Sequence, residues 1–317
     1  PQGHDRRHAL PDPLPVGSPV KHGPFIHGGG TIRKMMLQAV AALLPVCAAA
    51  LWRYGMDALW ILSAAIASAW LVDYWLDREN AFDGSAIMIG CLCGLLMPAT
   101  APFWLGACAG ALGVGLGKQC FGGLGQNLFN PAALSRVILM SVLPVYFFMP
   151  RWPMDGTTQA TPLAKELASE MPTLDVLFSG GYTGTLGESM PLALIAGALM
   201  LLYWRLIDWR VPLYFFSGIA FLALILPASA RMEGHAPWLA GHPLAHLFGG
   251  GTLLAGIFML TDPVTSPMTS RGRIIFSLLA ALYTMLVRYY TIYSDGVILA
   301  VLFANASVPL IDRVRSR

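Results

Sequence analysis

The chain has 317 residues, of which 56% are hydrophobic and only 12% are charged, and its formal net charge is +3. A soluble domain carries roughly 25% charged residues, so this composition, with a mean hydropathy of +0.61, excludes an ordinary soluble domain. The small net charge gives no reason to expect a nucleic-acid partner.

Residues 1–34 are polar and rich in Pro, Gly and His, and they lack the apolar core of a signal peptide. We interpret them as a cytoplasmic N-terminal tail. No metal site is predicted, because the histidines of the tail have no ligand-like spacing; they are His4, His8, His22 and His27.

Ten apolar runs follow the tail, many of them close to the roughly 20 residues that cross a bilayer core as a helix. They predict an all-α polytopic membrane protein with about ten transmembrane helices. The runs lie at about 35–52, 58–76, 84–99, 101–118, 131–149, 190–206, 211–229, 243–260, 273–291 and 295–311.

The third and fourth runs are short and are separated by Pro98-Ala-Thr-Ala-Pro102. These spans are therefore candidates for broken or re-entrant helices, whose freed backbone groups need protein or water partners. The fourth run also carries Gly106 and Gly110, and small residues four positions apart favour close helix packing in a membrane.

Lysine and arginine are unevenly distributed between the predicted loops. If both termini are cytoplasmic, the cytoplasmic loops collect most of them, including Arg33, Arg78, Lys118 and Arg273. This asymmetry follows the positive-inside rule and fits an even number of spans. We therefore place the tail and the C-terminal residues 312–317 on the cytoplasmic side.

A short motif recurs along the chain. Pro98-Ala-Thr-Ala-Pro102 returns as Pro263-Val-Thr-Ser-Pro267, and the same offset carries Asn130–Leu134 onto Asp295–Leu299. Two repeats of five helices would have opposite orientations in the membrane, as in inverted-repeat transporters, whose ligand sites lie where the halves meet. The alternative is that Pro and Thr often end membrane helices. The predicted repeats are residues 35–149 and 190–311.

The longest predicted outer loop, residues 150–189, contains the polar stretch Asp155-Gly-Thr-Thr-Gln-Ala-Thr161. Asp155-Gly156 is a turn signal, and Pro162 biases Thr161 towards an extended conformation and can begin a helix. Thr161 would then cap that helix, where a phosphate meets free N–H groups and the favourable end of the helix dipole. An ordinary helix cap explains the same residues.

Asn127 and Asn130 lie three residues apart, so on a helix they share one face. Asn130 followed by Pro131 is also typical of an N-cap and the first position of a helix. The two asparagines are candidates for binding a ligand, and the alternative is a structural cap at the cytoplasmic end of the fifth span.

Two acids lie at the edges of predicted spans. Asp262 ends the eighth span and is a candidate for an ion path, a cap, or a partner of Arg271 or Arg273. Asp295 opens the tenth span and is a second ion-path candidate, or a partner of Arg288. Three polar residues lie deeper in the apolar runs and are candidates for contacts between helices or with another subunit: Arg136, His246 and Asn305.

Four stretches occur in order over residues 20–315 and resemble one protein family. This family comprises the D subunits of Rnf complexes and the related B subunits of sodium-translocating NADH:quinone oxidoreductases. The chain's length favours the D subunits. The stretches are Asp155–Thr161, Gly122-Gly-Leu-Gly-Gln-Asn-Leu-Phe-Asn-Pro-Ala-Ala133, Leu260-Thr-Asp-Pro-Val-Thr-Ser-Pro267, and Asp295-Gly-Val-Ile-Leu-Ala-Val-Leu-Phe-Ala-Asn305 with Pro309-Leu-Ile-Asp312.

The resemblance implies a covalent cofactor. FMN would be joined to Thr161 through a phosphoester, with Asp155, Thr158 and Ala160 completing the motif that a flavin transferase reads. Gln159 departs from the family pattern, which has Gly at this position. The resemblance also implies a non-covalent flavin, riboflavin, near the two asparagines of the Gly122–Ala133 stretch.

The implied role is an electron relay in a six-subunit complex of the bacterial inner membrane. That complex couples ferredoxin and NAD to the movement of Na⁺ or H⁺, and the relay's fold is broadly like that of ammonium and urea transporters. Its implied partners include the flavin-carrying G subunit and the C subunit. No side chain is predicted to be catalytic, because the flavins carry out the redox chemistry. The alternatives are a B-type quinone-reductase subunit, a flavin-free transporter or channel, and a scaffold for partner subunits.

Overall fold

The computed structural model describes residues 31–148, 178, 184–188, 190–226, 242–291 and 296–313. Within these residues the backbone is helical apart from its connections, and one isolated antiparallel bridge joins Pro98 to Thr185. The all-helical prediction is therefore confirmed for this part of the chain. Most of the loop 150–189 lies outside the described residues, and its predicted boundaries stay predictions.

The first half of the described chain, as we call it, comprises α1 to α5. α1 (Ile32–Leu76) covers the first two predicted runs and is interrupted at Gly55, whose φ of 59° lies in the left-handed region that favours glycine. Two helices therefore meet at this residue. The other elements are α2 (Ser85–Leu95), α3 (Phe103–Gly115), η1 (Gln119–Phe121), α4 (Pro131–Val142) and α5 (Val145–Phe148).

The second half comprises α8 to α13, and it corrects one prediction. The run 243–260 is not one continuous helix, because Gly250 and Gly251 adopt φ values of 64° and 69° and break it. The elements are α8 (Pro191–Tyr203), α9 (Arg210–Ile225), α10 (Pro243–Phe248), α11 (Thr252–Leu254), the π-helix η2 (Ala255–Met259), α12 (Ser270–Tyr290) and α13 (Val297–Arg313).

Each predicted run contains a helix of the structure. Among the described helices, α1 and α12 are long and apolar enough to cross a membrane by themselves. Several of the others are shorter than a bilayer core requires, since breaks interrupt them. The arrangement of ten spans in two inverted repeats stays a prediction.

The predicted break between the third and fourth runs is confirmed. α2 ends at Leu95, and the segment that follows bonds to residues 185–187 instead of continuing the helix. The Leu186 N–H donates to the Met97 carbonyl at 3.0 Å, and the Gly187 N–H donates to the Leu95 carbonyl at 2.8 Å. Protein partners thus satisfy backbone groups that the break releases.

Gly106 and Gly110 bring α3 against α1, as predicted. A Cβ atom on Gly106 would lie 2.7 Å from the Ile61 carbonyl oxygen, and one on Gly110 would overlap the Ala65 carbonyl oxygen. The two backbones can approach this closely only because both positions lack a side chain.

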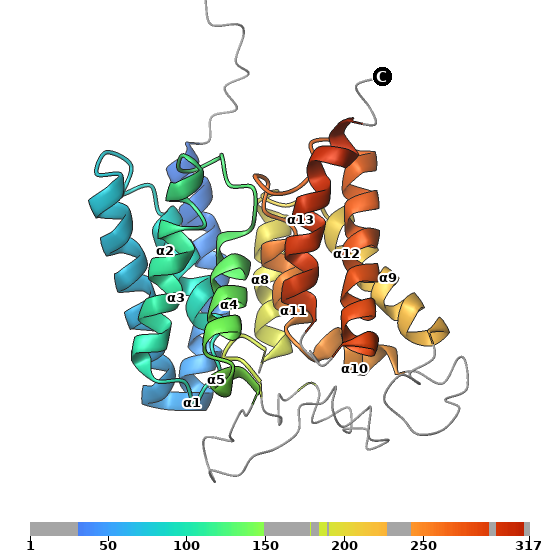
Figure 1. The fold of residues 1–317 in the computed structure, drawn as a ribbon, viewed down its shortest axis with the longest axis horizontal. Helices are drawn as coiled ribbons and strands as arrows, with labels where there is room; N and C mark the ends of the chain where they lie inside the picture. The colour runs from blue at the N-terminus through green and yellow to red at the C-terminus, as the bar shows by residue number, and fades with distance from the viewer. Residues whose placement is uncertain are drawn as a thin grey trace, which may run out of the picture. The chain divides into compact units, whose positions relative to one another are not determined.

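The two halves are packed in a similar way (Figure 1). In the first half α1 packs against α2 and α3, and in the second half α12 packs against α9 and α13. The halves meet where α1 contacts α8 and where α4 contacts α13. A ligand site between the halves would therefore lie near these contacts.

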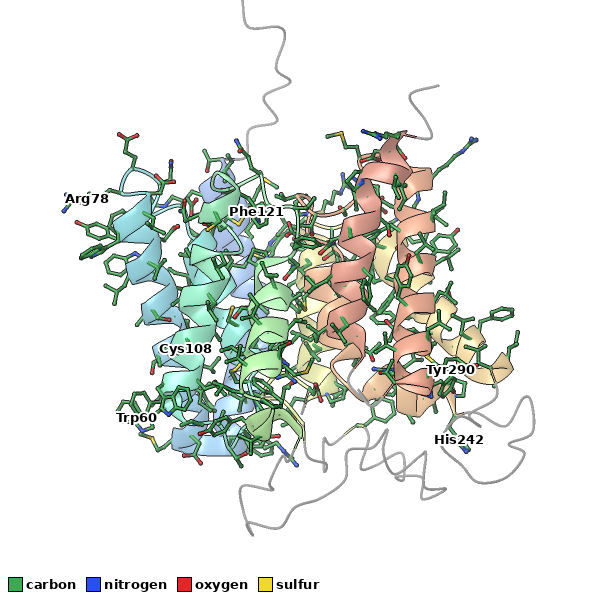
Figure 2. The ribbon with its side chains drawn as sticks, in the orientation of Figure 1. Trp60, Arg78, Cys108, Phe121, His242 and Tyr290 are labelled. Atoms are coloured by element: carbon green, nitrogen blue, oxygen red, sulfur yellow. The ribbon has the colours of Figure 1, made fainter. Side chains whose placement is uncertain are left out.

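α1 begins and α13 ends at the same end of this helical unit, which we call the terminal end (Figure 1). Arg78 and Phe121 lie towards the terminal end, and Trp60, His242 and Tyr290 lie towards the opposite end (Figure 2). Both ends of the described chain thus emerge on one side, as an even number of crossings requires.

The outer faces of the helices expose many large apolar side chains. A soluble monomer rarely exposes large apolar patches, so these faces fit contact with lipid or with partner subunits. The exposed side chains include Leu71, Leu199, Leu213, Phe221 and Phe303.

Candidate functional site

The two halves line a cavity together. α1, α2 and the segment 124–132 form one wall, and the end of α8, η2 and the segment 261–264 form the other. The first turns of α1 and α2 take part, which places the cavity towards the terminal end. The cavity volume is about 90 Å³, several times the roughly 10–15 Å³ that one bound water needs.

The cavity wall is mostly apolar, with a few polar groups, as is typical of a small-molecule site. Asn127, Asn130 and Asp262, which the sequence singled out separately, all line it. The structure thus brings together three predicted site residues from both halves. The other polar residues of the wall are Ser85 and Thr261, and the apolar ones include Met35, Met88, Leu201 and Phe258.

Asn127 carries an unpaired polar atom. Only 7% of its surface is exposed, and its Oδ1 atom has no hydrogen-bond partner among the described residues. Leaving a buried acceptor unpaired costs roughly 1–3 kcal/mol. A ligand or water with a donor group would remove this cost, so Asn127 is the residue that points most directly to a ligand.

Asn130 is the N-cap of α4, which confirms the predicted cap. Its Oδ1 accepts hydrogen bonds from the N–H groups of Ala132 and Ala133 at 3.1 and 3.2 Å, and Pro131 occupies the first helical position. Its Nδ2 donates to the Met259 carbonyl at 3.4 Å. The Asn130 side chain therefore caps α4 and also links it to η2 of the second half.

Asp262 stabilises its own turn. Its Oδ1 accepts from the Val264 N–H at 3.1 Å, and its Oδ2 accepts from the Thr265 hydroxyl at 3.5 Å. Burial raises the pKa of this half-buried carboxyl above its ordinary value, although the two hydrogen bonds oppose the shift. The charged form is therefore less favoured at the cavity wall than in water.

The alternative that pairs Asp262 with Arg273 is wrong. Arg273 Nη1 lies 3.0 Å from Asp208 Oδ2, and Arg273 Nε donates to the Pro267 carbonyl at 3.0 Å. Asp208 lies just before α9, and this ion pair links the start of α9 to the start of α12. The Asp208 carboxylate accepts a charge-assisted hydrogen bond from the guanidinium.

The three deeper polar residues contact other segments of the chain, as one of the two alternatives predicted. Arg136 of α4 donates to the carbonyl of Leu96, after α2. His246 of α10 contacts α12, because its carbonyl accepts from Arg288 Nη1 at 2.8 Å. Asn305 of α13 donates to the Thr265 carbonyl at 3.0 Å.

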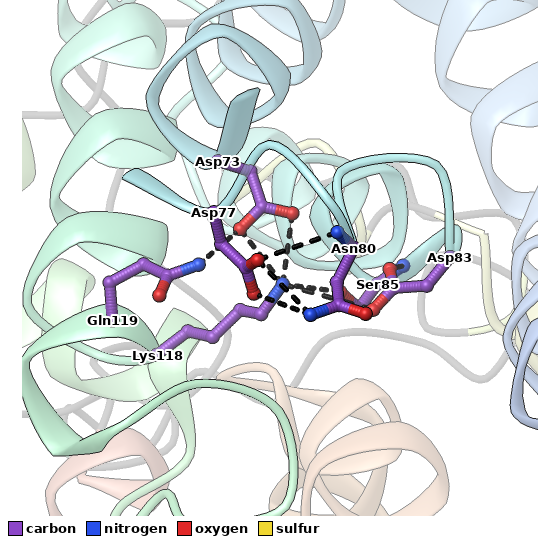
Figure 3. Close-up of polar contacts among 7 residues, drawn as sticks. All are labelled: Asp73, Asp77, Asn80, Asp83, Ser85, Lys118 and Gln119. Carbon is purple, nitrogen blue, oxygen red and sulfur yellow. Dashed lines mark hydrogen bonds and ion pairs between the residues drawn. The ribbon is translucent and has the colours of Figure 1, made fainter. Parts of the chain in front are cut away.

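Sequence reasoning missed a buried ion pair beside the cavity (Figure 3). Lys118, which the sequence predicted in a cytoplasmic loop, lies in the turn after α3 and is fully buried. Its Nζ lies 2.8 and 2.9 Å from the two carboxylate oxygens of Asp73. The same nitrogen donates to Ser85 Oγ at 2.9 Å, and Gln119 Nε2 donates to Asp73 Oδ1 at 2.6 Å. The available signal was a charged residue close to the end of each of two apolar runs, 58–76 and 101–118.

The remaining predicted site residues lie outside the described residues. They are Asp155, Thr158, Ala160, Thr161 and Asp295.

Comparison with known proteins gives matches over nearly the whole chain. The family model described as the NQR2, RnfD, RnfE family matches residues 19–317. The chain is 34% identical over 306 residues to the D subunit of the Na(+)-translocating ferredoxin:NAD(+) oxidoreductase complex of Acetobacterium woodii, covering 93% of this chain and 92% of the relative. It is 34% identical over 328 residues to the D subunit of the ion-translocating oxidoreductase complex of Stutzerimonas stutzeri, covering 90% of each. It is 29% identical over 316 residues to the D subunit of the proton-translocating ferredoxin:NAD(+) oxidoreductase complex of Clostridium ljungdahlii, covering 93% of each.

Proposed function

Because the chain belongs to the NQR2, RnfD, RnfE family, we propose that it is a flavin-carrying membrane subunit that relays electrons in an ion-translocating ferredoxin:NAD oxidoreductase complex. The observation that carries this proposal is the match over nearly the whole length to D subunits of such complexes. A match of this extent supports a redox-linked translocase subunit in a membrane complex.

We propose that FMN is joined through its phosphate to Thr161. The support is the motif of Asp155, Thr158 and Ala160, together with the family membership. Pro162 favours a helix start after Thr161, which suits an attached phosphate. Gln159, where the family pattern has Gly, is the position to test.

We propose that the cavity holds riboflavin. The residues fit such a group: the wall is mainly apolar, and the buried Asn127 Oδ1 needs a donor such as the N–H of a flavin ring. When bound, a flavin accepts and donates electrons, while the chain's own residues bind and orient it and exclude water. Asn130 holds the start of α4, and with it part of the wall, in place.

We propose that the complex couples this relay to the movement of Na⁺ or H⁺. The names of the relatives include both a Na(+)-translocating and a proton-translocating complex, so family membership leaves the ion open. Asp262 at the cavity wall and Asp295 are the ion-path candidates. The raised pKa of Asp262 suits a carboxyl that takes up and releases a proton.

The proposed topology places the chain in a bacterial inner membrane as ten helices in two inverted repeats. Both termini are cytoplasmic, and the loop 150–189 with its FMN is periplasmic. The common location of the start of α1 and the end of α13 supports an even number of crossings. The proposed partners are the G and C subunits of the complex and, during maturation, a flavin transferase.

Denaturing gel electrophoresis tests the covalent flavin. The wild-type chain from cells with an active flavin transferase is expected to give a fluorescent band that Thr161→Ala abolishes. Thr173→Ala, in the same loop, is the matched control and keeps the fluorescence. A dark wild-type band overturns the FMN proposal and favours a flavin-free transporter. Full electron transfer by a complex carrying Thr161→Ala favours a scaffold instead.

A further inference from the structure

We propose that Ser85 donates a hydrogen bond to the ligand of the cavity, and that the buried Lys118–Asp73 pair behind it holds this donor in position. The inference rests on the function proposed above, because it takes the ligand to be a flavin. It adds a positioning pair and a contact residue that the sequence did not suggest.

The backbone sets the position of Ser85. It is the first residue of α2, only 2% of it is exposed, and it forms part of the cavity wall. Its N–H donates to Asp83 Oδ1 at 2.7 Å, which ties down the start of the helix. The hydroxyl therefore sits on a short side chain at a fixed point of the wall.

The hydroxyl of Ser85 retains an unused donor (Figure 3). Its oxygen accepts a hydrogen bond from Lys118 Nζ at 2.9 Å, and an ammonium group can only donate, so the serine hydrogen takes no part in this contact. Within the part of the chain that the structure describes, no group accepts that hydrogen. The lysine charge polarises the hydroxyl and strengthens it as a donor.

Several polar groups surround the Lys118–Asp73 pair. Both oxygens of Asp73 accept from Lys118, and Gln119 donates to one of them. Asp83 Oδ2 lies 3.9 Å from the same ammonium nitrogen. Of these residues only Ser85 lines the cavity, and Lys118 contacts it directly.

The cavity thus offers two complementary groups, an unpaired acceptor at Asn127 Oδ1 and a donor at Ser85. A planar ring edge that alternates N–H and C=O groups matches this pair, and the pyrimidine ring of a flavin has such an edge. Reduction increases the electron density on that edge. A donor there stabilises the reduced form more than the oxidised form, so Ser85 raises the reduction potential of the ligand.

The test uses the full chain, produced without flavin transferase so that it carries no covalent FMN, with riboflavin as the probe. Ser85→Ala is expected to weaken the binding of oxidised riboflavin about fivefold, as for the loss of one hydrogen bond, and that of reduced riboflavin more strongly. The reduction potential of bound riboflavin therefore falls. Ser85→Thr, which keeps a hydroxyl, is expected to restore it.

Ser135→Ala is the matched control, because its buried hydroxyl donates to the Ala109 carbonyl at 2.7 Å and does not line the cavity. It is expected to lower stability without moving the potential. The double variant Asp73→Asn with Lys118→Gln removes the charges but keeps hydrogen-bonding groups. It is expected to lower the potential while riboflavin stays bound.

Two failures are distinguishable. If the wild-type chain binds no riboflavin, the proposed cavity ligand is wrong. If it binds riboflavin and Ser85→Ala has wild-type affinity and potential, the present inference alone is wrong. An unchanged reduction potential of riboflavin bound to the double variant would show that the Lys118–Asp73 pair does not position Ser85.

Discussion

The side chain of Asn305 accepts a hydrogen bond from the backbone N–H of Asn130 at 3.0 Å, and this contact joins α13 to the start of α4. Both residues are buried, so neither group can turn to water if the other is lost. The same asparagine donates to the Thr265 carbonyl at 3.0 Å. One side chain thus connects the two halves at the cavity.

Replacing this side chain is expected to destabilise the protein. Asn305→Leu leaves the Asn130 N–H and the Thr265 carbonyl unpaired, at a cost of roughly 1–3 kcal/mol for each buried group. The thermal unfolding midpoint in detergent measures the effect. Ser307→Ala is the control, since that hydroxyl bonds only within its own helix or at long range to Tyr283, and it should change the midpoint little.

The close contact between α3 and α1 predicts that alanine substitutions at two glycines of α3 affect stability in opposite ways. Gly110→Ala places a methyl group on the Ala65 carbonyl and forces the helices apart, at a cost on the order of 1–3 kcal/mol or more. Gly115→Ala meets nothing closer than a Val72 methyl at 3.7 Å, so the better helix propensity of alanine should leave stability unchanged or slightly higher. Equal yields of monodisperse protein from the two variants would contradict this packing.

The buried Lys118–Asp73 pair predicts a large effect for one substitution and a small effect for two. Lys118→Met leaves a buried carboxylate unpaired and is expected to cost about 3–5 kcal/mol. Adding Asp73→Leu removes the unpaired charge and should recover most of the stability. Unfolding midpoints of Lys118→Met, Asp73→Leu and the double variant provide the measurement, and additive losses in the double variant would show that the residues do not interact.

Asp208 predicts a loss of stability in acid. Burial alone would raise its pKa, but hydrogen bonds from the Arg210 N–H and from Arg273, with their charges, lower it below its ordinary value. A carboxyl with a lowered folded-state pKa stabilises the protein above its unfolded pKa of about 3.9, and this contribution is lost as pH falls through the folded pKa. Asp208→Asn should remove about 1 kcal/mol at neutral pH and show a smaller further loss below about pH 4. Parallel pH–stability curves for the two proteins would exclude the effect.

Replacing Asn127 is expected to affect ligand binding and protein stability differently. Asn127→Leu removes the unpaired buried oxygen, so the free protein should be as stable as the wild type or more so. Riboflavin binding should weaken about tenfold, because the acceptor for the ring N–H is gone. Fluorescence titration and thermal unfolding on the same preparation separate the two effects. A destabilised protein with unchanged affinity would indicate a purely structural residue.

Local sequence signals predicted much of the fold. Apolar runs located the helices, the proline-flanked motif located the break after α2, and Asn130-Pro131 located the cap of α4, because each feature depends on residues close together in the chain. The break inside the eighth run was missed, although Gly249-Gly250-Gly251 marks it. Hydropathy alone does not reveal a break that glycine produces.

The cavity itself was not predictable in this way. Asn127, Asn130 and Asp262 were recognised as separate candidates, but only the fold shows that they share one wall. The burial of Lys118 was not predicted, because its partner, Asp73, lies far away in the sequence, on α1, and a charge at the edge of an apolar run is ordinarily solvated. Its burial depends on the packing of α1, α2 and α3, which no local pattern contains.

The shared wall of the cavity has a thermodynamic consequence. If one half is displaced relative to the other, the distance changes between the wall residues of the first half, such as Ser85 and Asn127, and those of the second half, such as Phe258 and Asp262. A ligand whose affinity depends on that distance therefore biases the arrangement of the halves, and the arrangement biases the ligand's affinity by the same factor. If the oxidised and reduced ligands differ in their affinity for this wall, a change of redox state would shift the equilibrium between arrangements of the halves.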